Sequence, residues 1–177
     1  MKTPWYREPD RLISALLAAV GAGGVGFAYI LQRVFAVTPC ALCYYERVPY
    51  VLAAGLGLFG LLMPITPARR RIVVLCAAFV FAVGAGLALY HVGVENAWWA
   101  GTPACTSDTL ADRMSLSDMQ AALSTRARAR CDDVSWTLFG FSLAALNLAA
   151  SAGLCLICTM LAAEHRLWRV RRFRPRP

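Results

Sequence analysis

Two cysteines separated by two residues, Cys40 and Cys43, are the part of the sequence best suited to chemistry. Pro39 precedes them, and because proline suits the first turn of a helix but not its interior, we expect a helix to begin beside Cys40. Cysteines three apart on that turn share a face and can form a reversible disulfide. The exposed N–H groups and the positive end of the helix dipole lower the pKa of a thiol there, and the thiolate is the reactive form. The pattern therefore indicates a redox site.

Arg47 follows Cys43 by four residues, so on a continuous helix it shares the face of that cysteine and adds a positive charge. A C-x-x-C pair can instead attach haem, bind zinc or form an inert structural disulfide. Haem attachment requires a histidine directly after the second cysteine, and Tyr44 stands there. Zinc binding, which needs further ligands, and an inert disulfide both stay open on these residues alone.

The composition predicts an integral membrane protein. Of the 177 residues, 59% are hydrophobic and only 16% are charged, whereas soluble domains usually carry about 25% charged residues. Charge-free intervals separate Arg11 from Arg33, Arg47 from Arg69, Arg71 from Glu95, and Asp133 from Glu164. Each interval reaches the roughly 20 residues that a helix needs to cross a bilayer. We therefore expect an all-α membrane protein, a bundle of four transmembrane helices over about 12–31, 43–63, 72–91 and 136–161.

The basic residues predict the orientation of these spans. They gather before the first span, between the second and third, and after the fourth, as Lys2, Arg7, Arg11, Arg69, Arg70, Arg71 and the tail 164–177. An excess of Lys and Arg assigns these segments, and with them both termini, to the cytoplasm. The net charge of +8 is thus explained by contact with the lipid bilayer rather than by binding to nucleic acid. The other side receives the Cys40 segment and a long loop over 94–134.

The seven cysteines divide between the two sides. Cys40 and Cys43, together with Cys105 and Cys131 of the loop, face the outer compartment, where disulfides persist. The other three, Cys76, Cys155 and Cys158, lie toward the cytoplasm. The last two form a second C-x-x-C inside an apolar helix, where burial raises the pKa of a thiol and makes it inert.

His91 lies near the outer end of the third span, at the depth expected for Arg47. It is either an interfacial residue or a hydrogen-bond donor to something bound beside Cys43. Two G-x-G-x-x-G strings, at 21–26 and 55–60, fall inside predicted spans. A dinucleotide site requires a preceding strand in a soluble βαβ unit, so close helix packing through small residues explains both strings better.

The sequence resembles the DsbB family of disulfide-forming membrane proteins over nearly its whole length. The resemblance rests on four spans, a Cys105/Cys131 loop and the string Cys40-Ala41-Leu42-Cys43-Tyr44-Tyr45-Glu46-Arg47. It implies that Cys40–Cys43 passes electrons to a membrane quinone, ubiquinone or menaquinone, and that Cys105–Cys131 oxidises a periplasmic DsbA-like thiol protein. It also implies a quinone beside Cys43 with Arg47 and His91 nearby. The location it implies is the bacterial inner membrane, with the redox loops in the periplasm. The Cys155/Cys158 pair is not part of the family pattern.

The residues support such an acceptor independently. A partner with a potential near −120 mV cannot be oxidised by a glutathione pool at about −200 mV, and the sequence offers no flavin, nicotinamide or haem site. A lipid-soluble oxidant remains. The rival interpretation is a membrane metal-binding or transport protein that uses Cys40, Cys43, Cys105 and Cys131 as ligands. It requires four reduced thiols in an oxidising compartment, which counts against it, and we expect no metal in the resting protein.

Overall fold

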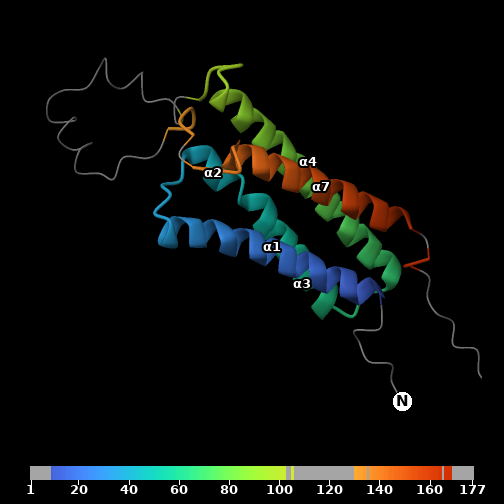
Figure 1. Ribbon diagram of the computed structural model, residues 1–177. Coiled ribbons are helices and arrows are strands. Elements are labelled where there is room, and N and C mark those ends of the chain that lie inside the picture. Colours follow the sequence, from blue (N-terminus) through green and yellow to red (C-terminus); the bar gives the residue numbers. More distant parts are fainter. Residues whose placement is uncertain (1–8, 103–104, 106–129, 135, 165, 169–177) are drawn as a thin grey trace, which may run out of the picture.

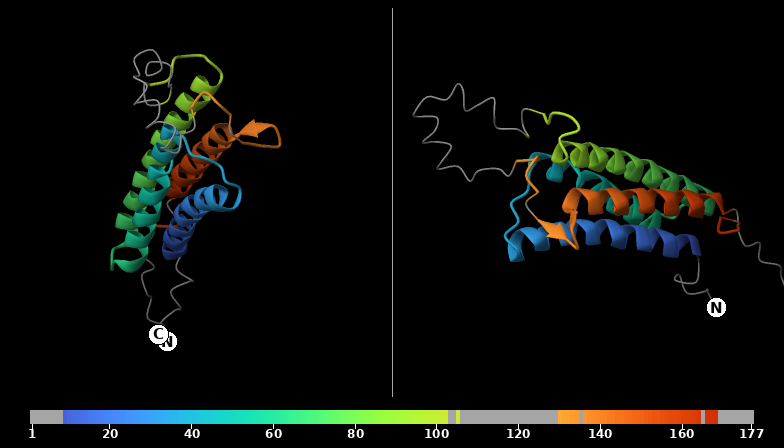
Figure 2. Two further views of the ribbon diagram at one scale, coloured as in Figure 1. Left: turned by 90° about the vertical axis from the view of Figure 1, so that its left-hand side faces the viewer. Right: turned by 45° about the horizontal axis from the view of Figure 1, so that its top comes forward.

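The computed structural model describes residues 9–102, 105, 130–134, 136–164 and 166–168. Most of the predicted outer loop, 94–134, and of the predicted basic tail, 164–177, therefore lies outside the described residues. The described part consists of helices and one small hairpin. In chain order these are α1 (Pro9–Val34), α2 (Ala41–Tyr45), α3 (Val48–Leu62), α4 (Pro67–Glu95), β1 (Thr137–Leu138), β2 (Phe141–Ser142) and α7 (Leu143–Ala163). The long helices α1, α3, α4 and α7 run side by side (Figures 1 and 2).

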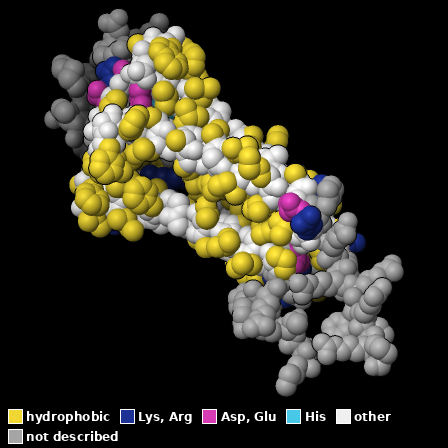
Figure 3. All heavy atoms as spheres, turned by 45° about the vertical axis from the view of Figure 1, so that its right-hand side comes forward, with side chains coloured by type: hydrophobic (Ala, Val, Ile, Leu, Met, Phe, Trp, Pro, Cys, Tyr) yellow, Lys and Arg dark blue, Asp and Glu magenta, His cyan; other side chains and the backbone are white. Residues whose placement is uncertain are grey.

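Within the described residues, three helices are long and apolar enough to cross a membrane: α1, α4 and α7. Helix α3 has 15 residues and is about 22 Å long, which is short of the roughly 30 Å of a hydrocarbon core. It packs against both α1 and α4 and completes the bundle. The surface of the bundle is largely apolar (Figure 3), with large exposed side chains such as Phe27 and Phe79. The expected fold class, an all-α membrane protein, is confirmed.

The expected second span over 43–63 is not one helix. The chain ends α2 at Tyr45, turns at Glu46 and Arg47, and begins α3 at Val48. Pro49 is the physical reason, because it has no N–H to donate to the carbonyl of Tyr45 four residues earlier. Proline is instead accommodated in the first turn of α3. The break separates the cysteine-bearing turn from α3.

The last helix also begins later than the expected residue 136. Residues 137–142 form a hairpin in which Thr137 pairs with Ser142 and Leu138 with Phe141. The two turn residues, Phe139 and Gly140, have φ angles of 52° and 84°, the left-handed backbone that two-residue hairpin turns require. Ser142 then caps α7 by accepting a hydrogen bond from the N–H of Ala145 at 3.1 Å.

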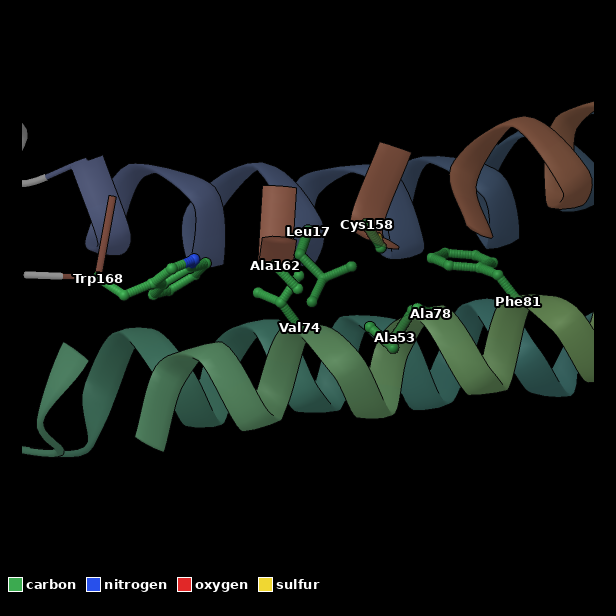
Figure 4. Packing of buried hydrophobic residues seen from close by; sticks show 9 residues of the cluster. Leu17, Ala53, Val74, Ala78, Phe81, Cys158, Ala162 and Trp168 are labelled. Atoms are coloured by element: carbon green, nitrogen blue, oxygen red, sulfur yellow. The ribbon is translucent and has the colours of Figure 1, made fainter. Parts of the chain in front are cut away.

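Small residues let α1 and α3 approach closely, as the glycine strings predict. A Cβ added at Gly21 would come within 2.5 Å of the backbone nitrogen of Ala54, and one at Gly57 would meet the backbone of Ala18. Side chains from the four long helices then fill the centre of the bundle. Figure 4 shows Leu17, Ala53, Val74, Ala78, Phe81, Cys158, Ala162 and Trp168 converging there.

An ion pair ties the helices together at the end of the bundle opposite the cysteines. Arg70, only 3% exposed, lies 2.5 Å from the carboxylate of Asp10 at the start of α1. Its Nε donates to the carbonyl of Gly60 in α3 at 2.8 Å. The neighbouring Arg71 donates to the carbonyl of Ala162 in α7 at 2.8 Å. Two arginines counted from the sequence as loop charges therefore lie in the first turn of α4 and link it to three other helices.

Candidate active site

The structure brings the four predicted cysteines to one end of the bundle. Cys40, Cys105 and Cys131 are 3%, 3% and 0% exposed and form one cluster with Leu42 and Val94, against which Cys43 packs. The backbone N–H of Cys131 donates to the carbonyl of Cys105 at 3.2 Å. Cys40, Cys105 and Cys131 thus belong to one buried cluster, which places the two predicted cysteine pairs side by side.

Cys40 and Cys43 face each other across the first turn of α2. Their sulfur atoms are 2.7 Å apart, and the N–H of Cys43 donates to Cys40 Sγ at 3.2 Å. Cys40 thus serves as the N-cap of the short helix, in the place where serine or aspartate is usually found. The expectation that a helix begins beside Cys40 is confirmed, and its first turn holds the two sulfurs within reach of each other.

The two thiols have different acidities. The hydrogen bond from Cys40 lowers the pKa of Cys43 from its ordinary 9.0 to about 7, with His91 acting in the same direction and burial opposing. The same hydrogen bond, followed by burial, raises the pKa of Cys40. Burial also raises the pKa of Cys131, to about 11. Near neutral pH the negative charge therefore resides on Cys43, while Cys40 keeps its proton.

His91 lies inside the site. Its side chain is 4% exposed, and its Nε2 is 3.6 Å from Cys40 Sγ. Its Nδ1 is 2.8 Å from Oε1 of Glu46. A carboxylate partner at Nδ1 fixes the ring orientation and favours the tautomer that carries its proton on that nitrogen. The lone pair of Nε2 then faces the thiol of Cys40.

A second group of polar side chains holds Glu46 in place. Asn147 of α7 donates from Nδ2 to Oε2 of Glu46 at 2.9 Å, and the hydroxyl of Tyr50 donates to Oδ1 of Asn147 at 2.8 Å. Ser151 donates to the same Oδ1 at 3.4 Å. Sequence reasoning missed Glu46, Asn147 and Tyr50 as members of the site. The signal for Asn147 was present, because an amide inside an apolar span is costly unless it has a partner.

Arg47 lies at the site, in the turn between α2 and α3, so that it and Cys43 do not belong to one unbroken helix. Its guanidinium carbon lies 5.0 Å from the ring centroid of Tyr44 and 5.7 Å from that of Tyr29, within the range of cation–π attraction. Arg47 thereby connects the turn before α3 to the outer half of α1.

A cavity of about 490 Å³ extends from these residues into the bundle. Its outer end is lined by Cys40, Cys43, Arg47 and His91, and its inner part by apolar residues of α1 and α7 such as Phe27 and Leu154. Helix α1 packs mainly on α3, and α7 packs mainly on α4. The space between α1 and α7 is therefore left open and forms the cavity. Figure 3 shows basic atoms at the bottom of a hollow surrounded by hydrophobic side chains.

The four cysteines that the rival metal-binding interpretation uses do not form one group of potential ligand atoms. Within the part of the chain that the structure describes, the one group of potential ligand atoms that lie within 4.8 Å of one another comes from Cys40, Cys43 and His91. Cys105 and Cys131 do not belong to it. The second C-x-x-C lies elsewhere in the bundle, with Cys158 buried in the central core among Ala77, Phe81 and their neighbours.

Comparison with known proteins identifies the family of the chain. Residues 10–161 match the family described as Disulfide bond formation protein DsbB. The chain is 29% identical over 169 residues to Disulfide bond formation protein B of Acinetobacter baumannii, with 93% of each chain covered. It is 30% identical over 162 residues to the protein of that name from Saccharophagus degradans, covering 88% of this chain and 92% of the relative. For the Stutzerimonas stutzeri protein the identity is 28%, over 82% and 85% of the two chains.

The matched region contains nearly all of the helical bundle and all of the cysteines placed above. The match and the helices long enough to cross a membrane together identify the chain as a multi-pass membrane protein that takes part in disulfide bond formation. The chain belongs to the DsbB family.

Proposed function

We propose that the protein is a thiol:quinone oxidoreductase of the inner membrane, which reoxidises a periplasmic DsbA-like thiol protein and passes the electrons to the membrane quinone pool. The observation that carries this proposal is the cavity beside Cys43. Its volume of about 490 Å³ is in the usual range for small-molecule sites, roughly 300–1,000 Å³. Polar residues gather at the cysteine end, and apolar residues of α1 and α7 line the rest. Such a cavity fits the polar ring and isoprenoid tail of a quinone.

The contacts among the cysteines support a relay of disulfide exchange. A thiolate of the partner attacks the Cys105 sulfur of a Cys105–Cys131 disulfide, which forms a mixed disulfide and releases Cys131. Cys131, which lies in the same buried cluster as Cys40, then attacks Cys40 in a Cys40–Cys43 disulfide and releases Cys43. The second thiolate of the partner displaces Cys105, which attacks Cys131 and releases Cys40. Each exchange breaks one S–S bond and forms another, and the partner leaves oxidised.

The relay leaves Cys40 and Cys43 as a dithiol. A bound quinone supplies the oxidant, taking up two electrons and two protons and leaving the Cys40–Cys43 disulfide. Cys43 is the thiol adapted to give up electrons, because its pKa of about 7 makes it a thiolate near neutral pH. His91 Nε2, 3.6 Å from Cys40 Sγ, accepts the proton of Cys40, and Glu46 at Nδ1 stabilises the imidazolium that results. Asn147 keeps Glu46 oriented toward His91.

The order of exchange is tested by trapping. In Cys131→Ser the Cys105 thiol has no disulfide partner in the loop and can attack the disulfide of the oxidised partner, which releases one thiol of the partner. Because Cys131 is absent and cannot displace the partner from Cys105, this variant should accumulate a covalent complex between Cys105 and a small periplasmic thiol protein, visible on a non-reducing gel. Cys105→Ser should abolish that complex and leave the partner reduced, while added quinone still oxidises Cys40 and Cys43. The control is the double variant Cys155→Ser, Cys158→Ser, which should behave as the wild type. Partner oxidation at the normal rate by Cys105→Ser would refute the relay.

The acceptor is tested separately with purified protein. Ubiquinone and menaquinone are each added to the reduced protein, and loss of the quinone absorbance is followed. The proposal is supported if one of the two quinones is reduced and the amount of reduced quinone equals the amount of Cys40–Cys43 disulfide formed. If neither is reduced while Cys40 and Cys43 are free thiols, the cavity does not serve a quinone and the proposed acceptor is wrong.

A further inference from the structure

The same three side chains that form the centre of the site have the donor set of a metal site. Cys40, Cys43 and His91 place two sulfur atoms and one imidazole nitrogen within 4.8 Å of one another. Zinc bonds of about 2.3 Å to sulfur and 2.0–2.1 Å to nitrogen imply, for tetrahedral geometry, an S···N separation of about 3.6 Å and an S···S separation of about 3.8 Å. The distance from Cys40 Sγ to His91 Nε2 is 3.6 Å. The two sulfurs, 2.7 Å apart, need to separate by only about 1 Å.

The surroundings of His91 strengthen this resemblance to a metal site. Metal-binding histidines usually donate their second ring N–H to a carboxylate, which orients the ring and makes the ligating nitrogen more basic. Glu46 accepts at His91 Nδ1 at 2.8 Å, and its other oxygen accepts from Asn147 at 2.9 Å. The imidazole is therefore fixed with Nε2 toward the two sulfurs before any ion arrives. The lone pair of His91 Nε2 that would accept the proton of Cys40 is the same one that would bind a metal. His91 therefore does not have to change its orientation for the site to hold an ion.

We propose that the dithiol form of the protein binds one Zn²⁺ through Cys40 Sγ, Cys43 Sγ and His91 Nε2, with the fourth coordination position open to the cavity. Two thiolates and an imidazole are the ligands that zinc prefers. Binding displaces the protons of the thiols and transfers no electron. The disulfide form offers no thiolate and does not bind. Zinc therefore selects the reduced protein and prevents Cys40 and Cys43 from forming their disulfide.

The cavity supplies a path for the ion. All three ligands line it. Glu95 and Asp133 also line it, and their carboxylates offset the positive charges of Arg47 and Arg130 in the same lining, so that the cavity does not repel a cation. The proposal concerns the free chain and requires neither a quinone nor a thiol partner, so it stands or fails independently of the function proposed above.

The experiment measures Zn²⁺ binding to the full chain in detergent, after reduction and removal of the reductant, by competition with a chromophoric chelator. We expect one Zn²⁺ per reduced chain and none per chain oxidised at Cys40 and Cys43. Co²⁺ replacing Zn²⁺ should give thiolate-to-cobalt charge-transfer absorption from two thiolates. Saturating Zn²⁺ should also slow the oxidation of the reduced chain by diamide, a small-molecule thiol oxidant, at least tenfold.

Variants separate this site from the alternatives. Cys40→Ser and Cys43→Ser should each weaken binding at least 100-fold, and Glu46→Gln, which keeps the shape of the side chain, should weaken it about tenfold. The double variants Cys105→Ser, Cys131→Ser and Cys155→Ser, Cys158→Ser should each still bind one ion. Loss of binding in either double variant, unchanged affinity in Glu46→Gln, or no stoichiometric binding by the reduced chain would overturn the proposal.

Discussion

The acidity of Cys43 should depend on the thiol of Cys40. In the structure the hydrogen bond from Cys40 is the largest cause that lowers the pKa of Cys43 to about 7, from an ordinary 9.0, while burial acts in the opposite direction. Cys40→Ala removes the donor and leaves the burial, so the pKa of Cys43 should return to about 9 or above. Cys40→Ser keeps a hydroxyl donor and should produce a smaller shift.

The expected change in reactivity follows from two opposing effects. At pH 7 a rise in pKa from about 7 to about 9 reduces the thiolate fraction from about one half to about one hundredth, roughly fiftyfold. A more basic thiolate is also a better nucleophile, with a Brønsted coefficient of about 0.4–0.5, which returns a factor of about six to ten. The net rate at pH 7 should therefore fall only about five- to eightfold. Above pH 10 the Cys40→Ala variant should react about six to ten times faster than the wild type.

The assay is the pH dependence of alkylation by iodoacetamide. Reduced, quinone-free protein is labelled for short times in detergent, and the Cys43 peptide is quantified by mass spectrometry so that other thiols do not contribute. Because the thiolate is the basic form, the rate should rise with pH, with a midpoint near 7 in the wild type and near 9 in Cys40→Ala. Cys158→Ser, in the other C-x-x-C, is the matched control and should keep the wild-type midpoint. A midpoint that stays near 7 in Cys40→Ala, or shifts equally in Cys40→Ser, would refute the reasoning.

Two further predictions concern buried or partly buried charges. Arg47→Ala should raise the KM for quinone about tenfold, or about 1.4 kcal/mol, because the charge beside the cavity is lost, and Arg47→Lys should keep part of the affinity because it keeps the charge without the planar fork. Normal quinone turnover by Arg47→Ala in a quinone reduction assay would limit the residue to a structural role.

Asp10→Asn should lower the free energy of unfolding by about 3–5 kcal/mol, because it leaves the 3% exposed Arg70 without its counter-charge. Thermal unfolding in detergent measures this loss, and the double variant Asp10→Leu, Arg70→Met should recover most of it; a loss below about 1 kcal/mol in Asp10→Asn would contradict the role of the pair.

The sequence alone determined the class of protein and the local structure around Cys40 and Cys43. Long charge-free runs predict membrane helices because a charged side chain in the hydrocarbon core costs free energy, so a spanning segment must be a continuous run without charges. Such a run can be read from the sequence without knowing which residues meet in space. The placement of Cys40 and Cys43 on a helical turn after Pro39 is equally local, and it appears in the structure as predicted. The roles of Cys105 and Cys131 stay predictions, although the structure places both beside Cys40.

The sequence did not predict how distant polar residues pair. Pro49 interrupts the second span, and this turn directs Glu46, rather than Arg47, toward His91. Asn147 reaches Glu46 from about one hundred residues away along the chain, so no spacing rule relates them. Such pairings depend on which faces of α4 and α7 are in contact. The packing of small and apolar side chains between the helices decides which faces these are. The buried carboxylate, amide and imidazole are stabilised by pairing with one another, because burying a polar group without a hydrogen-bond partner costs free energy.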